Sequence, residues 1–214
     1  MTKKIASFDG IIFDLDGTLW DSTKPVAMAW NQAIQKIDAE LRPISEATVQ
    51  SIMGLPNDKI FQKIFPNKDQ ASREEISDRC REEELSCLKR TRPELYPGVD
   101  EGLPRLFQHF PLFIVSNCET QYLTAFFECT GYASFFKDSE CFGNTLKPKS
   151  ENIKRVIQRN GLQQPVYIGD TAGDESAAKE AGVTFFHVTY GFGSPRGDCL
   201  SFRRFSELVE FLLS

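Results

Sequence analysis

The sequence predicts an α/β protein whose parallel sheet is flanked by helices and whose first strand is followed by an inserted helical lid. Two observations support this fold class. From residue 96 onwards, apolar runs typical of buried strands are separated by single helical patterns, which implies a parallel sheet with right-handed crossovers. Between residues 20 and 93, by contrast, helical patterns follow one another and no strand signal appears.

The first predicted strand, over residues 11–13, runs into Asp14 and Asp16. An apolar run beside a turn signal is typical of a strand buried on both faces of a parallel sheet. Asp14 is then at the carboxyl end of the strand, where open α/β sheets place ligands and chemistry. Extended geometry sends both carboxylates to the same side, and adjacent carboxylates stay ionised only with a cation or a shared proton. An Asp cluster that only caps a following helix is the alternative.

Four helices are predicted in the inserted block. Capping residues and a proline at positions 21–25 favour a helix start there, and apolar residues recur at helical spacing as far as residue 37. The other three are a helix capped by Ser45, a short helix over residues 57–65 and a long, charged helix over residues 71–90.

Helices and strands alternate in the remainder of the chain. The expected helices cover residues 100–109, 120–129, 150–160, 175–181 and 205–213. The expected strands cover residues 111–115, 166–168 and 184–189, with a weaker one at residues 140–143. Glycines at positions 131, 161 and 182 predict where three of the helices end.

Polar residues follow two of the later strands as well. Ser116 and Asn117 come after the second apolar run, and their hydroxyl and amide groups can donate hydrogen bonds to phosphoryl oxygens. Asp170 and Asp174 follow the strand at residues 166–168, and oxygen ligands at the mouth of a sheet suit a hard cation. An ordinary loop start for Ser116 and a helix cap for Asp174 are the alternatives.

A lysine before a proline stands at the expected start of the helix over residues 150–160. The helix dipole does not favour an ammonium group at this end of a helix. A bound anion flanked by carboxylates would favour a lysine there, because the positive charge of the lysine offsets theirs. Lys147 precedes Pro148, while Lys149 lies two residues further on and competes for the same role. A solvated basic loop is the alternative interpretation.

Composition limits the partners and the compartment. With 214 residues, 41% of them hydrophobic, the chain can form one α/β domain with an insertion. A net charge of −5 argues against a nucleic-acid partner. The six cysteines show no CxxC pairing, acids interrupt the sequence after residues 1–4, and no apolar run is long enough for a bilayer. We therefore expect a cytoplasmic protein with no membrane partner.

Together these motifs resemble those of the haloacid dehalogenase-like phosphohydrolases. The matching features are an apolar strand followed by DxDGT, a Ser after the second strand, a Lys before Pro, and a final GDxxxD. The resemblance covers essentially the whole chain. It implies a Rossmann-like catalytic core over residues 1–19 and 94–214 and an inserted α-helical cap domain over residues 20–93. Such a cap is typical of phosphoglycolate phosphatase-like and β-phosphoglucomutase-like members.

The resemblance also implies a Mg²⁺ cofactor and roles for the acids. Asp14 is expected to be the nucleophile and a metal ligand. Asp16 is expected to be the general acid and base, and to bind the metal through its backbone carbonyl. Asp170 is the expected direct metal ligand, and Asp174 is expected to orient the lysine or a metal-bound water without binding the metal itself.

The phosphate-binding residues implied by the resemblance are Ser116, Asn117, Thr18 and Lys147, and Thr18 is also expected to position Asp16. Lys147 is the expected catalytic lysine, since the family's lysine is typically followed by proline. Lys149 stays the competing candidate.

The leading expectation is a Mg²⁺-dependent phosphatase that hydrolyses a small phosphorylated metabolite through an aspartyl-phosphate. A phosphosugar mutase of the β-phosphoglucomutase type is the alternative, and it needs cap residues that hold a bisphosphate; Arg42, Lys59 and Lys63 are the available cations. A non-catalytic phosphate-binding protein is the third possible function. Asp16 argues against dehalogenation, which needs no leaving-group acid. The substrate and the oligomeric state, monomer or homodimer, are left open.

Overall fold

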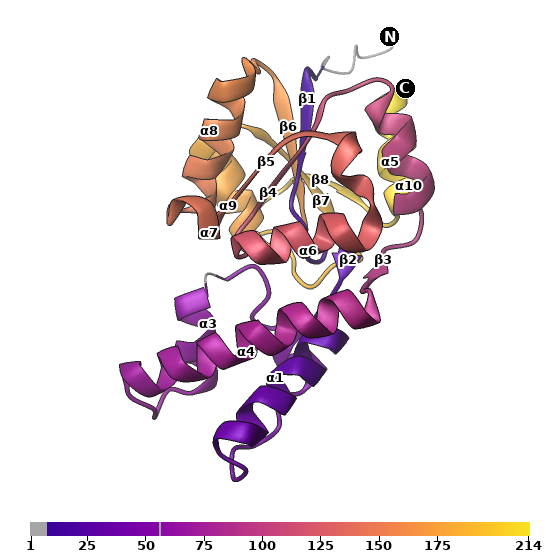
Figure 1. Ribbon diagram of the computed structural model, residues 1–214. Coiled ribbons are helices and arrows are strands. Elements are labelled where there is room, and N and C mark those ends of the chain that lie inside the picture. The colour runs from indigo at the N-terminus through magenta and orange to yellow at the C-terminus, as the bar shows by residue number, and fades with distance from the viewer. Residues whose placement is uncertain (1–7, 56) are drawn as a thin grey trace.

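The structure, a computed structural model, describes residues 8–55 and 57–214 of the chain. Its core is a six-stranded parallel sheet in the order β5-β4-β1-β6-β7-β8 (Figure 1). The strands are β1 (Gly10–Phe13), β4 (Leu112–Ser116), β5 (Phe136–Cys141), β6 (Pro165–Gly169), β7 (Thr184–Val188) and β8 (Leu200–Phe202). The expectation that residues 1–4 begin no secretory segment falls outside the described residues.

Helices cover both faces of this sheet. One face carries α5 (Val99–Phe107), α6 (Thr120–Thr130) and α10 (Phe205–Leu213), and the other carries α8 (Lys149–Asn160) and α9 (Ala172–Ala181). The short helices η1 (Tyr132–Phe135) and α7 (Phe142–Thr145) flank β5. None of the helices in the described part of the chain has the length and apolar character needed to cross a bilayer.

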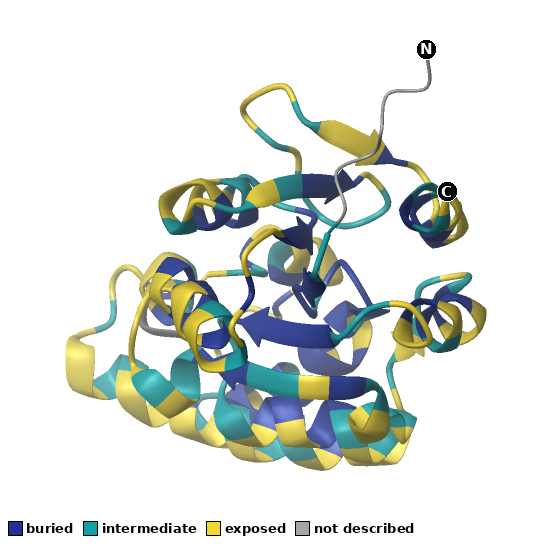
Figure 2. Ribbon diagram, turned by 90° about the horizontal axis from the view of Figure 1, so that it is seen from above, coloured by how far each residue is buried: buried dark blue, intermediate teal, exposed yellow. Residues whose placement is uncertain are grey.

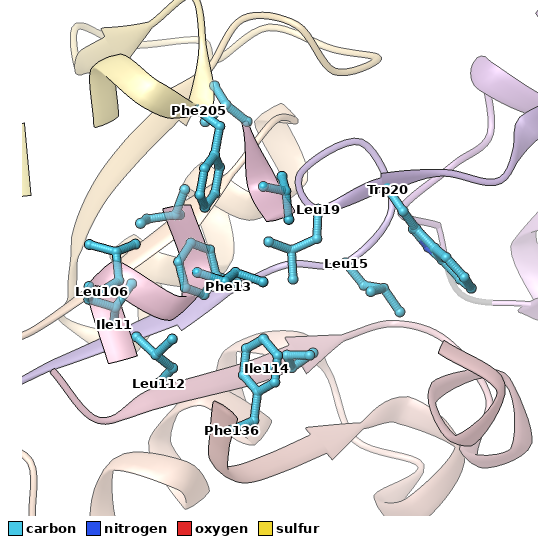
Figure 3. Packing of buried hydrophobic residues seen from close by; sticks show 14 of the residues in the cluster. Ile11, Phe13, Leu15, Leu19, Trp20, Leu106, Leu112, Ile114, Phe136 and Phe205 are labelled. Atoms are coloured by element: carbon cyan, nitrogen blue, oxygen red, sulfur yellow. The ribbon is translucent and has the colours of Figure 1, made fainter. Parts of the chain in front are cut away.

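Alternation along the strands divides the buried side chains between the two faces. Phe13 packs with Ile114 and Phe205 in one cluster, while Ile12 packs with Tyr167 in the other. All five are buried, and Figure 3 shows the first cluster around Phe13. Seen from above, the central strands are buried, and exposed residues lie on the outer surfaces of the helices, in loops and on the edge strands β5 and β8 (Figure 2). A sheet buried on both faces explains why its central strands are continuous apolar runs.

A second group of helices lies beyond the carboxyl ends of the strands (Figure 1). It comprises α1 (Thr23–Ile37), α2 (Glu46–Gln50), α3 (Asn57–Ile64) and α4 (Gln70–Thr91). These helices have a hydrophobic core of their own, which includes Trp30, Ile34 and Phe61. They form the expected cap-like region, and its exact boundaries at residues 20 and 93 stay a prediction.

The connection between the cap and the sheet differs from the expectation. A small antiparallel pair joins β2 (Trp20–Asp21) to β3 (Glu94–Leu95), so the chain leaves and re-enters the core at adjacent points. No strand was expected at Trp20, because two residues are too few to show an alternating pattern.

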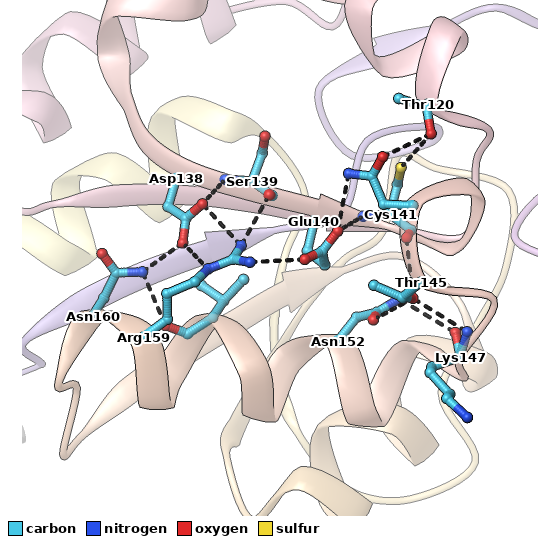
Figure 4. A network of polar contacts seen from close by, with 12 residues as sticks. Thr120, Asp138, Ser139, Glu140, Cys141, Thr145, Lys147, Asn152, Arg159 and Asn160 are labelled. Carbon is cyan, nitrogen blue, oxygen red and sulfur yellow. Dashed lines mark hydrogen bonds and ion pairs between the residues drawn. The ribbon is translucent and has the colours of Figure 1, made fainter.

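Strand β5 begins four residues earlier than expected, and its polar side chains explain the weak sequence signal. Arg159 of α8 forms ion pairs with Asp138 and Glu140 of this edge strand (Figure 4). Asn160 also donates a hydrogen bond to Asp138. Charged residues on an edge strand oppose pairing with another chain, and here they bind the strand to its neighbouring helix.

Gly102 provides a test of how α5 packs against α10, because the two helices meet at this glycine without a side chain between them. A Cβ at Gly102 would lie 2.6 Å from Cε1 of Phe205 and 2.8 Å from Cγ2 of Val209. We expect Gly102→Ala to lower the free energy of unfolding by about 1–3 kcal/mol, since overpacking outweighs the gain in helix propensity. Urea unfolding measures this.

The exposed neighbour Glu101 on the same helix is the control. Glu101→Ala should change the free energy of unfolding by less than about 0.5 kcal/mol. Equal stability of the Gly102→Ala variant and the unaltered protein would contradict the close packing of α5 on α10.

Candidate active site

Asp14 follows β1 at the carboxyl edge of the sheet and is 1% exposed. Its backbone N–H donates to the carbonyl of Ile168, at 2.8 Å, which extends the pairing of β1 with β6 by one residue. The chain then turns at Gly17, whose φ is +84°. A Cβ at Gly17 would lie 2.2 Å from Oδ2 of Asp170, so both the conformation and the space require glycine.

A buried lysine lies between two of the carboxylates, and it is Lys149. Its Nζ is 2.8 Å from Oδ1 of Asp14 and 2.6 Å from Oδ1 of Asp174. Lys149 is 5% exposed. The two carboxylates hold the pKa of Lys149 well above its usual value, although burial alone would lower it.

The expectation that Lys147 occupies this position is wrong, because its side chain is exposed. Leu146 has a left-handed conformation with φ of +54°, and Pro148 is the extended N-cap of α8. Lys149 is therefore the first helical residue and is directed inwards. The backbone of Lys147 is held by Thr145 and Asn152, while its side chain points away from them (Figure 4).

Asp174 has both carboxylate oxygens engaged. Oδ1 accepts from Lys149, and Oδ2 accepts from the backbone N–H and the hydroxyl of Thr171, at 3.0 and 2.6 Å. The Thr171 hydroxyl accepts in return from the N–H of Asp174, which forms a capping box at the start of α9. Burial raises the pKa of Asp174, but Lys149 and these hydrogen bonds outweigh it and lower the pKa overall. Asp174 therefore caps a helix and orients Lys149.

Asp14, Asp170 and Asp174 each offer an oxygen, and the three oxygens lie within 4.8 Å of one another. In Asp170, Oδ2 accepts from the N–H of Phe192, whereas buried Oδ1 has no hydrogen-bond partner among the described residues. Since Asp174 is already engaged, Asp14 and Asp170 are the pair that fits a hard cation such as Mg²⁺. The backbone carbonyl of Asp16 as a further ligand stays a prediction.

Burial and mutual repulsion disfavour the ionised forms of this pair. Burial, together with Asp174, raises the pKa of Asp14 to about 7 despite the opposing effect of Lys149. Burial, together with Asp174 and Asp14, raises the pKa of Asp170 to about 8. A divalent cation bound between the two groups would stabilise the ionised form of both.

The carboxylate of Asp16 is held by a separate set of donors. Its Oδ1 is 2.9 Å from Nε1 of Trp20, 2.7 Å from the hydroxyl of Ser22 and 2.6 Å from the hydroxyl of Tyr122. Burial raises the pKa of Asp16, and the hydrogen bonds from Tyr122, Ser22 and Trp20 oppose this. A fixed carboxyl group with a raised pKa suits a general acid. Tyr122 is 106 residues away on α6, and no local signal in the sequence points to it.

The other three residues expected to bind phosphate differ in whether they line a cavity beside Asp14. Ser116 is buried at the end of β4 and lines a cavity together with Asp14 and Asp16. Asn117 also lines this cavity, but its Nδ2 donates to the carbonyl of Gly54 at 2.8 Å and so connects core to cap. Thr18 is fully buried and is not among the residues that line the cavity.

The cavity lies between the core and the cap and has about 780 Å³ of empty space, part of it open to solvent. The core supplies Asp14, Asp16 and Ser116 at its base. The cap supplies most of the remaining wall: Val26, Trp30, Met53, Gly54, Leu55, Ile60, Phe61, Ser77, Arg81, Glu84 and Leu85. A polar base under a largely apolar roof is typical of a small-molecule site.

Comparison with known proteins agrees with this geometry. A model of the haloacid dehalogenase-like hydrolase family matches residues 11–188. The phosphoglycolate phosphatase of Vibrio cholerae is 30% identical over 195 residues, which cover 85% of this chain and 84% of that protein. The phosphoglycolate phosphatase of Escherichia coli is 27% identical over 217 residues, covering 89% and 84%.

A solved structure has the same fold. The haloacid dehalogenase-like hydrolase of Streptococcus pneumoniae has a TM-score of 0.83 and 23% identity, with 97% of this chain and 99% of that chain covered. The chain therefore belongs to the haloacid dehalogenase-like hydrolases. Within this family it is a phosphatase similar to the phosphoglycolate phosphatases, which confirms the predicted family, fold class and enzyme class.

Lys149 and Lys147 offer a matched pair of substitutions. We expect Lys149→Met to lower kcat/KM for p-nitrophenyl phosphate by at least ~100-fold, because it removes the buried charge that is paired with Asp14 and Asp174. Lys147→Met should leave kcat/KM within about twofold of the unaltered enzyme. Circular dichroism checks that both variants fold. Loss of activity in the Lys147 variant alone would contradict the assignment.

If Asp14 and Asp170 bind Mg²⁺, its affinity should depend on pH, because the metal would displace protons from both carboxyl groups. Their pKa values of about 7 and 8 mean that both are largely protonated at pH 6. We expect the affinity to be at least ~10-fold weaker at pH 6 than at pH 8.5. Isothermal titration calorimetry measures it directly.

Asp170→Asn should abolish this binding, whereas the control Asp198→Asn, at an exposed aspartate, should leave it unchanged. Equal Mg²⁺ affinity at both pH values, or unaltered binding by the Asp170 variant, would place the metal elsewhere.

Proposed function

We propose that the protein is a Mg²⁺-dependent phosphatase that hydrolyses a small phosphorylated metabolite through a phosphoaspartate on Asp14. The observation that carries this proposal is the environment of Asp14. It is buried at the base of the cavity, one of its oxygens is bound to Lys149, and it lies near Asp170, which has a buried oxygen without a hydrogen-bond partner among the described residues.

In the first step a carboxylate oxygen of Asp14 forms a bond to phosphorus while the bond to the leaving oxygen breaks. Protonated Asp16 gives its proton to that oxygen, so the product leaves as a neutral alcohol. Trp20, Ser22 and Tyr122 keep the Asp16 carboxyl group in place during this transfer.

In the second step water attacks phosphorus, and the bond between phosphorus and Asp14 breaks. Asp16, now ionised, takes a proton from the water and returns to its starting state. Lys149 offsets the negative charge around Asp14 in both steps, and the Ser116 hydroxyl donates to a phosphoryl oxygen. When bound by Asp14 and Asp170, Mg²⁺ would screen the repulsion between the carboxylate and the phosphate dianion.

The cap contributes to the proposed mechanism because it covers the cavity. Closing an active site excludes bulk water, which strengthens the interactions of Lys149 and limits side reactions. The hydrogen bond from Asn117 to Gly54 connects the core to the cap beside the reacting groups. Asn117 is therefore proposed to hold the cap closed in addition to lining the site.

The other functions considered gain less support. The cations available for a second phosphate, Arg42, Lys59 and Lys63, are exposed and do not line the cavity, so a mutase is not favoured. The complete set of acids and lysine around Asp14 does not favour a protein that only binds phosphate. The relatives are named phosphoglycolate phosphatases, which makes 2-phosphoglycolate one substrate to test.

Asp14→Asn tests the nucleophile. We expect it to lower kcat for p-nitrophenyl phosphate with Mg²⁺ by at least ~10³-fold, since an amide cannot form the phosphoenzyme. The Asp198→Asn control should have the kcat of the unaltered enzyme. EDTA should stop turnover in the unaltered enzyme and in this control. Circular dichroism verifies the fold.

Substantial activity of the Asp14 variant would exclude Asp14 as the nucleophile. Conversion of a hexose 1-phosphate to its 6-phosphate without phosphate release would identify a mutase. Phosphate binding without any turnover would identify a binding protein.

A further inference from the structure

The cap wall of the cavity contains an acidic side chain that the proposed chemistry does not use. Glu84 lies on α4 of the cap, is half-buried and lines the cavity together with Asp14 and Asp16. Its Oε2 accepts a hydrogen bond from Nε1 of Trp30 at 2.7 Å. Trp30 is 5% exposed and belongs to the cap core, so it fixes the position of the carboxyl group.

The charges around Glu84 are mostly negative. Burial raises the pKa of Glu84 to about 7; the Trp30 hydrogen bond and Arg81 oppose this, while Asp16 and Glu119 add to it. Arg81 is the only basic side chain among the described residues that line the cavity. Its Nη2 is 3.4 Å from Oδ1 of Asp78, and its side chain is 40% exposed. Asp78 and solvent therefore share part of its charge, while its buried Nε has no hydrogen-bond partner among the described residues.

We propose that Glu84 selects the leaving group: it accepts a hydrogen bond from a hydroxyl or ammonium group of the leaving alcohol and disfavours an alcohol that carries a carboxylate. This inference rests on the proposed function, because the phosphate must lie at Asp14 for the leaving group to face the cap. It departs from the substrate in the relatives' name, since phosphoglycolate carries a carboxylate.

The physical basis is the cost of placing like charges in an apolar space. Because Trp30 donates to Glu84, the carboxyl group is arranged as an acceptor, and a donor on the substrate complements it. At a pH above about 7, where Glu84 is ionised, a substrate carboxylate there would leave two anions together with little water. An ammonium group would form a charge-assisted hydrogen bond with the ionised form instead.

The rest of the cap wall limits the shape of the leaving group. Most of the cap residues that line the cavity with Glu84 are apolar, among them Val26, Ile60, Phe61 and Leu85. Apolar walls favour a short carbon chain and offer few partners for further polar groups. The inferred leaving group is thus a small alcohol with one donor near its far end.

Four phosphomonoesters of similar size test the inference on the intact enzyme with Mg²⁺ at pH 8.5, where Glu84 is ionised. They are O-phosphoethanolamine, 2-hydroxyethyl phosphate, ethyl phosphate and 2-phosphoglycolate, which present an ammonium, a hydroxyl, a methyl and a carboxylate group. We expect kcat/KM for at least one donor-bearing ester to exceed that for 2-phosphoglycolate by at least ~10-fold. Comparison of the ammonium and hydroxyl esters tells which donor is preferred.

Glu84→Gln and the control Glu82→Gln separate a role in selection from a general effect of charge. Glu82 is on the same helix, with a side chain that is 70% exposed. In Glu84→Gln we expect the ratio of kcat/KM for O-phosphoethanolamine to that for 2-phosphoglycolate to fall by at least ~10-fold. The ratio should not change in Glu82→Gln. A merely structural role of Glu84 would lower both rates and leave the ratio as it was.

Two results would overturn the inference while the proposed function stands: preference of the unaltered enzyme for 2-phosphoglycolate, or an unchanged ratio in Glu84→Gln. Hydrolysis of none of the four esters, nor of p-nitrophenyl phosphate, would overturn the proposed function together with the inference.

Discussion

The ion pairs of Lys149 with Asp14 and Asp174 are the interaction on which the rest of the site depends. Removing an ammonium group from water costs several kcal/mol, and two carboxylates at 2.8 and 2.6 Å offset that cost. Because Asp174 is also fixed by the Thr171 capping box, the lysine is positioned by the start of α9 as well as by α8. The carboxylate of Asp14 is thereby held in one orientation, with Asp170 beside it.

The sheet makes this arrangement possible, and the cap completes it. Parallel pairing brings the ends of β1, β4 and β6 to one edge, so residues more than 100 positions apart meet without long loops. The cap adds no group that reacts in the proposed chemistry. It contributes the roof of the cavity, including Trp30 and Glu84, and this is where members of one family can differ in substrate while they share the chemistry at the base.

The sequence alone predicted the parts of the molecule that depend on local patterns. Buried strands are apolar runs, and Asp14 and Asp170 were found because each follows such a run. Lys149 could not be distinguished from Lys147, because the choice depends on the left-handed conformation of Leu146 before the N-cap of α8. Tyr122 was missed because its link to Asp16 is purely tertiary. Strand β8 was missed because three residues, two of them exposed, form no recognisable pattern.

In the proposed mechanism, phosphorus becomes bonded to Asp14 while this residue and Asp170 share a divalent metal ion. A crystal structure of the protein with Mg²⁺ and beryllium fluoride, which imitates a phosphoryl group on a carboxylate, tests it most directly. We expect beryllium on a carboxylate oxygen of Asp14 and a metal ion in contact with both Asp14 and Asp170. Beryllium bonded to another residue, or a metal ion that does not touch Asp170, would contradict it.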